Sequence, residues 1–272
     1  FALGEALGAF MKEQNMHGDK VLIGRDTRPS GKALLSSFHQ GLQENGFHGV
    51  SAGVLPTPAL AFGVMEKKMS MGVMITASHN PAQDNGFKFF SALGKKLSDS
   101  EEESIERKIL IKEKKSQIIE TESIEIIESY INYISGLFPQ NMLKCKKIVI
   151  DLSNGATQQT TPTILKKLGA EIHAINLDSG EINDRVGSEF PEVMSQKVKE
   201  LNADFGLAHD GDGDRVIFCN SNGEEIPGDK ILGLLAINEA KHDRLAQKGF
   251  VATVHSNSGL DASLKKKGIS LH

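Results

Sequence analysis

The sequence predicts an α/β fold of tandem, similar, mixed α/β domains, each with three layers in which helices cover both faces of a sheet. A pattern of apolar strand, polar turn, helix, glycine and second strand occurs three times in the 272 residues. This pattern favours right-handed crossovers and parallel strands. The copies start roughly a hundred residues apart, which indicates separate domains of similar topology rather than a solenoid.

The first copy opens with an apolar strand at residues 20–24 and closes with a second strand at 47–54. Between them, Pro-Ser-Gly at 29–31 is typical of a helix start, and Ser30 is a suitable cap. Gly46 then marks the end of that helix. The spacing predicts a strand, a crossover helix and a parallel strand.

The other two copies repeat this order. The second predicts a strand at 147–151, a helix at 162–168 and a strand that ends at Ile175. The third predicts a strand at 250–254 and a helix at 260–267. A glycine follows each helix, as expected at a helix C-terminus.

A further short apolar strand at 71–75 leads into residues 76–81, Thr-Ala-Ser-His-Asn-Pro. A serine in such a turn exposes its hydroxyl, but serine is a weak nucleophile unless a base or a metal activates it. No Gly-x-Ser-x-Gly elbow of a serine hydrolase surrounds Ser78. Taken alone, Ser78 and His79 leave both an ordinary loop and a catalytic loop open.

The strand at 20–24 is followed by a polar cluster of Arg25, Asp26 and Arg28. Two arginines beside a helix N-terminus are suited to binding phosphate. In the alternative interpretation, Asp26 pairs with its neighbours and braces the serine loop. Both stay open at this point, and the cluster is not counted among the catalytic candidates.

Residues 98–137 are charged and have isoleucines at helical spacing. This pattern predicts one or two amphipathic helices that cover the first domain. The lysines between Lys112 and Lys115 are interpreted as the solvated face of these helices rather than as a binding surface.

The most informative stretch is Asp-Gly-Asp-Gly-Asp-Arg at residues 210–215, which follows an apolar run at 203–208. The apolar run predicts a buried strand, so Asp210, Asp212 and Asp214 are expected at its end. Packing three like charges so closely is costly unless a cation lies among them. Oxygen-only ligands favour Mg²⁺, Mn²⁺ or Ca²⁺ over zinc, and a solvated acidic turn is the alternative.

An EF-hand calcium loop is excluded. Such a loop needs glycine at position 6 and glutamate at position 12. Counting from Asp210, these positions hold Arg215 and Ser221.

Composition excludes several classes of protein. The net charge is −4 and no basic patch is interleaved with aromatics, so nucleic acid is not an expected partner. Apolar runs are shorter than a membrane span needs, and no signal peptide is visible. The two cysteines, Cys145 and Cys219, lack metal-ligand spacing and are interpreted as reduced thiols of a cytoplasmic protein.

The two loops together carry a resemblance to a known family. The serine loop at 76–81, the segment Asn85–Phe89 with Lys88, and the loop at 210–215 occur in the order found in α-D-phosphohexomutases. This family includes phosphoglucomutases, phosphomannomutases and phosphoglucosamine mutases. The segments at 24–28, 88–97 and 153–156 are most similar to the bacterial phosphoglucosamine mutase branch. The resemblance extends over the whole chain.

The resemblance implies a phosphoserine enzyme with a sugar bisphosphate intermediate. Its implied Mg²⁺ ligands are Ser78, Asp210, Asp212 and Asp214. Arg215 is implied to grip the phosphate, Lys88 to act as general acid or base near the sugar hydroxyl, and His79 to donate to the phosphate or hold the loop. A surface lysine on a strand edge is the alternative for Lys88. The implied partners are a hexose or hexosamine phosphate and its bisphosphate, and a homodimer is compatible with the family.

We expect domain I at residues 1–138, domain II at 139–226 and the start of domain III at 227–272. The third domain is expected to be truncated and the fourth absent, so the sequence is interpreted as a fragment with little mutase activity of its own. A metal-dependent phosphatase and a non-catalytic phosphate- or metal-binding module are the competing functional classes. Loss of phosphate from Ser78 that depends on a sugar phosphate distinguishes the mutase from both.

Overall fold

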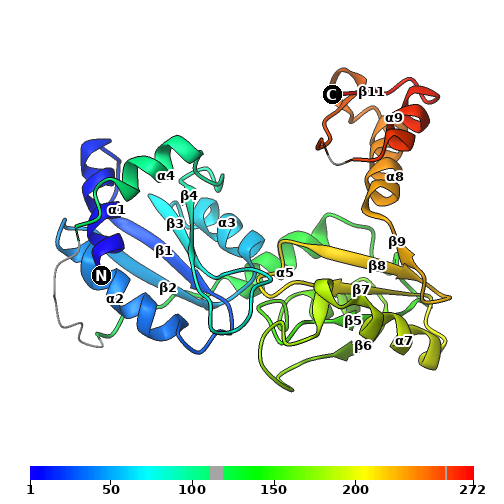
Figure 1. The fold of residues 1–272 in the computed structure, drawn as a ribbon, viewed down its shortest axis with the longest axis horizontal. Helices are drawn as coiled ribbons and strands as arrows, with labels where there is room; N and C mark the ends of the chain where they lie inside the picture. Colours follow the sequence, from blue (N-terminus) through cyan, green and yellow to red (C-terminus); the bar gives the residue numbers. More distant parts are fainter. Residues whose placement is uncertain (111–118, 255) are drawn as a thin grey trace.

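The computed structural model describes residues 1–110, 119–254 and 256–272. Two lobes lie side by side, each built on its own sheet, and a smaller C-terminal segment projects from the second lobe (Figure 1). Both sheets are mixed and carry helices on both faces, so the predicted three-layer α/β class is confirmed. Within the described residues no helix is long and apolar enough to cross a membrane.

The first sheet has the strand order β2-β1-β3-β4. Its strands are β1 (Lys20–Arg25), β2 (His48–Val54), β3 (Met71–Ile75) and β4 (Phe87–Ser91). β1 pairs in parallel with β2 and β3, whereas β4 returns antiparallel to β3. The three parallel strands follow the sequence prediction, and β3 has the predicted bounds.

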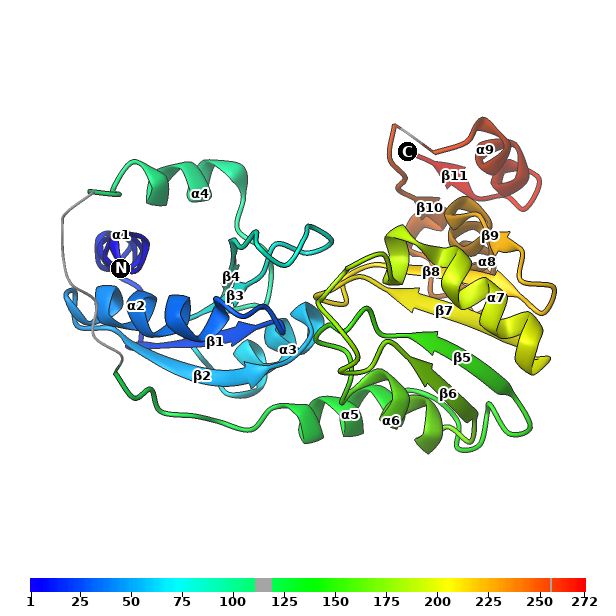
Figure 2. The same cartoon turned by 60° about the horizontal axis from the view of Figure 1, so that its bottom comes forward.

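Helices cover both faces of this sheet. α1 (Ala2–Glu13) and α2 (Gly31–Gln43) pack on one face, where Leu7, Phe38 and Ile23 are buried in one core cluster. α3 (Thr57–Glu66) packs on the other face with a second cluster around Leu22. α4 (Asp99–Glu106) lies outside α1. Figure 2 shows these layers edge-on.

The second sheet repeats the topology, with the order β6-β5-β7-β8-β9. Its strands are β5 (Lys147–Asp151), β6 (Glu171–Ile175), β7 (Phe205–His209), β8 (Val216–Asn220) and β9 (Glu225–Ile226). α6 (Thr161–Lys167) and α7 (Pro191–Leu201) are the crossover helices, and a 3-10 turn spans Gly187–Glu189. In both sheets a loop connects the last parallel strand to an antiparallel neighbour, β3 to β4 and β7 to β8. The serine loop between β3 and β4 and the acidic loop between β7 and β8 therefore occupy equivalent positions.

Among its described residues, the predicted helical region at 98–137 is helical towards its two ends. α5 (Ile127–Gly136) packs against α3 and α6 and so joins the two lobes. Between the helices, Ile124 and Glu122 pair with Ser51 at the edge of β2, so the chain there is extended. Backbone pairing with an exposed strand edge thus outweighs the helical spacing of the isoleucines. Residues 111–118, with the Lys112–Lys115 cluster, lie outside the described residues.

The C-terminal segment contains α8 (Gly228–Lys241), α9 (Ser258–Lys265) and the strand pair β10 (Gly249–Phe250) and β11 (Ser270–Leu271). The strand predicted at 250–254 is wrong beyond Phe250, because pairing with β11 covers only two residues. Val251 and Val254 are consequently exposed. The expected domain limits at 138 and 226 stay predictions.

Candidate active site at the junction of the two lobes

Ser78 lies at the junction of the two lobes, beside the acidic loop. Its hydroxyl donates a hydrogen bond of 2.6 Å to Oδ2 of Asp210, 132 residues further along the chain. Both side chains are buried. The two loops meet because each emerges from the carboxyl end of a parallel strand, and the two sheets present these ends to one another.

The serine loop is held in an unusual backbone conformation. Ser78 has φ +52°, in the left-handed region that residues other than glycine seldom adopt. Its N–H donates to Oγ1 of Thr76 at 2.9 Å, and that hydroxyl donates to Oδ2 of Asp26 at 2.7 Å. This chain of bonds offsets the backbone strain and fixes the direction of the Ser78 side chain.

Arg28 is a buried brace for the same loop. Its guanidinium donates to Asp26 at 2.9 Å and to backbone carbonyl oxygens of the serine loop. These acceptors are Ser78 at 3.0 Å, Asn80 at 2.8 Å, Asp84 at 2.8 Å and Pro81. The geometry therefore supports the interpretation in which this polar cluster braces the serine loop.

The acidic loop depends on its glycines. Gly213 has φ +69°, and a Cβ at this position would lie 2.3 Å from the side chain of Thr157. A Cβ on Gly211 would lie 2.8 Å from the carbonyl oxygen of Ser78. Glycine at both positions lets the acidic loop turn sharply and lets its backbone come into contact with the backbone of the serine loop.

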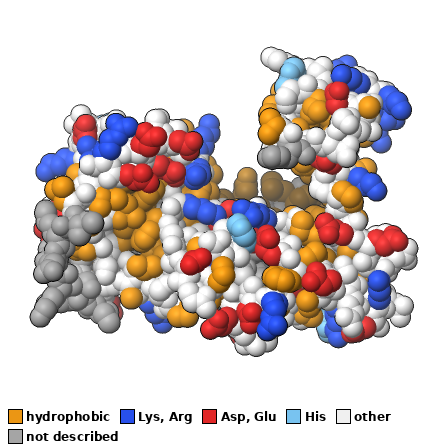
Figure 3. All heavy atoms as spheres, viewed as in Figure 1, with side chains coloured by type: hydrophobic (Ala, Val, Ile, Leu, Met, Phe, Trp, Pro, Cys, Tyr) orange, Lys and Arg blue, Asp and Glu red, His pale blue; other side chains and the backbone are white. Residues whose placement is uncertain are grey.

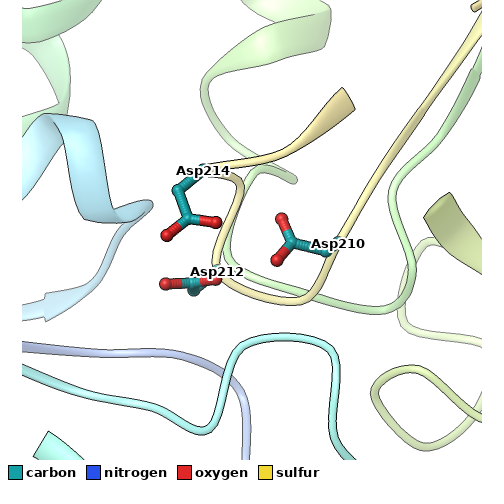
Figure 4. Close-up of side chains that lie close together, drawn as sticks. All are labelled: Asp210, Asp212 and Asp214. Carbon is teal, nitrogen blue, oxygen red and sulfur yellow. The ribbon is translucent and has the colours of Figure 1, made fainter. Parts of the chain in front are cut away.

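The three aspartates face one another across a small space (Figure 4). One carboxylate oxygen from each of Asp210, Asp212 and Asp214 lies within 4.8 Å of the others, and the first two residues are buried. Oδ1 of Asp212 is buried and has no hydrogen-bond partner among the described residues. A buried carboxylate oxygen without a donor is costly, and a hard cation with oxygen ligands satisfies it. The residues present therefore fit a divalent metal ion.

The carboxylates differ in their affinity for protons. Burial raises the pKa of Asp210 to about 6. The charges of Asp212 and Asp214 also raise this pKa, whereas the hydrogen bond from Ser78 lowers it. Burial also acts to raise the pKa of Asp212, but hydrogen bonds from Lys88 and Thr57 outweigh it and hold that pKa below its ordinary value. The environment thus gives two neighbouring carboxylates different pKa values.

Lys88, on β4, reaches across to the acidic loop. Its ammonium lies 2.7 Å from a carboxylate oxygen of Asp212 and 2.7 Å from one of Asp214. Burial acts to lower the pKa of Lys88, but the bonds to these two carboxylates raise it. Although β4 is an edge strand of its sheet, the Lys88 side chain is 23% exposed and is part of the charged centre.

Arg215 and His79 lie at the margin of the site. The Arg215 side chain is 52% exposed, and among the described residues its guanidinium makes long contacts, 3.9 Å to Glu189 and 4.0 Å to Asp214, so an incoming anion can compete for it. His79 lines a cavity of about 470 Å³ between the serine loop and residues 181–190. Figure 3 shows basic side chains and a histidine gathered at the junction of the lobes, below the projecting C-terminal segment.

Three contributors were not among the site residues predicted from the sequence. Thr57 donates through both its hydroxyl and its N–H to Asp212, and the N–H bond measures 2.9 Å. Asn183 donates to the serine loop, and Arg28 braces it. Arg28 stood in a recognised polar cluster, whereas Thr57 and Asn183 carry no local signal, because their partners are more than a hundred residues away.

Comparison with known proteins gives the family. Residues 1–116 match the family "Phosphoglucomutase/phosphomannomutase, alpha/beta/alpha domain I". Residues 128–223 match domain II of the same family. Phosphoglucosamine mutase from Natranaerobius thermophilus is 41% identical over 276 residues, which cover 99% of this chain and 62% of that protein.

Solved structures agree. A phosphoglucomutase/phosphomannomutase family protein from Burkholderia thailandensis superimposes with a TM-score of 0.82 at 25% identity, over 99% of this chain and 60% of that one. N-acetylphosphoglucosamine mutase from Aspergillus fumigatus, in complex with GlcNAc-6P and magnesium, has a TM-score of 0.50 at 18% identity over 79% of this chain and 59% of that one. With two family domains matched over most of its length and a relative at 41% identity, this chain belongs to the phosphoglucomutase/phosphomannomutase family.

Proposed function

We propose that this chain carries the phosphoserine and metal-binding half of a phosphoglucosamine mutase active site, which interconverts glucosamine 6-phosphate and glucosamine 1-phosphate. The observation that supports this most is the hydrogen bond from the Ser78 hydroxyl to Asp210, within a cluster of three carboxylates. The choice of hexosamine rests on the 41% identical relative. Glucose and mannose phosphates are the alternative substrates, because the family description covers both.

In this proposal Ser78 carries a phosphoryl group. A sugar hydroxyl attacks the phosphorus and loses its proton to a base, the bond from phosphorus to the serine oxygen breaks, and that oxygen keeps the electron pair. The sugar becomes a bisphosphate. In the reverse sense, the serine oxygen then takes the other phosphoryl group from the sugar, so the enzyme is regenerated. Such transfers need alignment and charge neutralisation more than covalent chemistry.

The side chains have distinct proposed roles. Asp210, Asp212, Asp214 and an oxygen on Ser78 would hold Mg²⁺, which would supply Lewis-acid neutralisation of phosphate charge. Arg215 binds the phosphate through its exposed guanidinium. Lys88 remains the proposed proton carrier for the sugar hydroxyl, and its ammonium is already placed beside the carboxylates. For His79 we propose a supporting contact to the loop or phosphate, and a homodimer stays a prediction.

The chain spans 62% of the length of the first relative, so turnover of a sugar phosphate is proposed for the whole protein rather than for these residues alone. A phosphate- and metal-binding fragment with little turnover is the second candidate for the chain as given. Loss of phosphate from Ser78 that depends on a sugar phosphate distinguishes the mutase from a non-catalytic binding fragment.

The test is intact and peptide mass analysis of the chain after incubation with Mg²⁺ and glucosamine 1,6-bisphosphate. We expect one added phosphate on the peptide that contains Ser78, and none in Ser78→Ala. Glucose and mannose 1,6-bisphosphates, run in parallel, report the sugar preference. Absence of phosphate on Ser78 with all three donors, and in the full-length parent protein, would contradict the proposal.

A further inference from the structure

Two carbonyl oxygens of the serine loop are each held from both lobes. The carbonyl oxygen of Ser78 accepts from the Arg28 guanidinium at 3.0 Å and from Nδ2 of Asn183 at 2.7 Å. The carbonyl oxygen of Asn80 accepts from the same Arg28 nitrogen at 2.8 Å and from the same Asn183 nitrogen at 3.1 Å. One amide and one guanidinium thus form four hydrogen bonds to two backbone oxygens.

The two donors belong to loops of different lobes. Arg28 is fixed to the first sheet through Asp26. Asn183 lies in the loop between β6 and α7, and its N–H donates to the carbonyl of Ser153 at 3.0 Å. Its backbone has φ +60°, and its neighbour Ile182 is 3% exposed. Asn183 is therefore a rigid part of the second lobe that reaches the serine loop of the first.

A third link between the lobes depends on the chemical state of the serine. The Ser78 hydroxyl donates its hydrogen to Asp210. When a phosphoryl group is esterified to that oxygen, the hydrogen is gone and the bond cannot form. The phosphate charge also repels the carboxylate unless a cation lies between them. The bonds from Asn183 reach backbone oxygens, so they do not depend on the state of the side chain.

We propose that Asn183 is a positioning residue that keeps Ser78 at the lobe junction after the Ser78–Asp210 hydrogen bond has been lost. It acts through the backbone of the serine loop and does not touch the reacting atoms. The anchoring itself follows from the contacts, whereas its importance for phosphorylation rests on the proposed function. The experiment therefore needs one readout that is independent of phosphate chemistry.

The first readout is amide hydrogen exchange of the peptide spanning residues 76–86. Asn183→Gly removes the amide and tolerates the positive φ, so it tests the contact without added backbone strain. Asn202→Gly is the matched control, because Asn202 is an exposed asparagine with φ +49° at the end of α7. We expect the Ser78 and Asn80 amides to exchange about fivefold faster in Asn183→Gly, because the variant loses about one net hydrogen bond. We expect no change in the control.

The Ser78–Asp210 bond and the Asn183 bonds are expected to act together in holding the serine loop. Ser78→Ala removes the bond to Asp210 without any phosphate, and so imitates that part of the phosphorylated state. We expect the effect of Asn183→Gly on loop exchange to be larger in the Ser78→Ala background than in the unmodified chain, because two links to the second lobe are then lost together. Equal loop exchange in Asn183→Gly and Asn202→Gly, in both backgrounds, would overturn the proposal.

The second readout is the rate at which the Ser78 peptide gains phosphate from glucosamine 1,6-bisphosphate. We expect Asn183→Gly to slow this rate by up to about a hundredfold with Mg²⁺ affinity unchanged, because small displacements of a reacting group have effects of that size. Asn183→Asp keeps the shape but lacks the donor, so it should resemble Asn183→Gly. An unaffected rate would refute the positioning role. If neither this chain nor the full-length parent protein gains phosphate on Ser78, the proposed function fails, while the exchange data still decide the anchoring.

Discussion

At the scale of single residues, the environment of Asp210 gives the site a dependence on pH. Its carboxylate is buried next to two other carboxylates, and its pKa is raised to about 6. Asp212 is buried to a similar degree, but its pKa is lowered because Lys88 and Thr57 donate to it. Protons and a metal ion therefore compete mainly at Asp210.

We predict that Mg²⁺ affinity falls as pH is lowered through 6. A carboxyl with a pKa of about 6 is almost fully ionised at pH 7.5 and mostly protonated at pH 5.5, so the apparent affinity should fall about fourfold between these values. Calorimetric titration at both pH values measures this change, and buffers of different ionisation enthalpy report the proton released. Equal affinity at both values would mean that Asp210 is not a ligand.

Asp212 has the one buried carboxylate oxygen of the cluster that lacks a donor among the described residues. We predict that Asp212→Asn weakens Mg²⁺ binding at least about tenfold, because it removes a charge and replaces one oxygen by a donor. Asp204→Asn is the control, since Asp204 is paired with Lys146 just before β7, at the strand end opposite the site. If Asp212→Asn and Asp204→Asn bind Mg²⁺ equally well, the ion sits elsewhere.

At the scale of elements, the site depends on two hairpin loops that approach at backbone distance. Each loop joins the last parallel strand of its sheet to an antiparallel strand, β3 to β4 and β7 to β8. The glycines of the acidic loop make the approach possible, because a side chain at Gly211 would collide with the serine loop.

We predict that Gly211→Ala destabilises the chain by about 1–3 kcal/mol, the usual cost of overpacking, and also weakens Mg²⁺ binding. The added Cβ would lie 2.7 Å from Ile182 and 2.8 Å from the Ser78 carbonyl oxygen, so the two loops must separate. Gly228→Ala is the control, because a Cβ there meets nothing within 4 Å. Urea unfolding and metal titration measure both effects. Identical behaviour of the two variants would show that the loops are not in close contact.

At the scale of the whole molecule, the site joins two lobes that have separate cores. The core around Phe38 belongs to the first sheet and the core around Val149 to the second. Between them, α5 packs on helices of both lobes, and the serine and acidic loops meet on the site side. Binding at the junction should therefore stabilise the arrangement of the lobes as well as the loops.

We predict that Mg²⁺ at about one hundred times its dissociation constant stabilises the folded chain by about 2.7 kcal/mol relative to EDTA. Thermal unfolding followed by circular dichroism measures the change. Asp212→Asn, with Mg²⁺ bound at least about tenfold more weakly, should lose about half of this stabilisation or more at the same Mg²⁺ concentration, whereas Asp204→Asn should keep it. An equal rise in melting temperature for both variants would indicate a general salt effect.

The sequence by itself determined the strands at 71–75 and 147–151, the three-layer class and the two loops that form the candidate site, because periodicity, glycines and alternating carboxylates are local signals. It misplaced the strand at 250–254 beyond Phe250 and, among the described residues of the helical region, those at 119–126, where pairing partners decide the structure. Only the tertiary structure decided that Arg28 braces the serine loop, that Thr57 and Asn183 serve the site, and that Lys88 joins two aspartates. These contacts connect residues 50 or more positions apart, so they depend on how the two sheets meet, which no local pattern encodes.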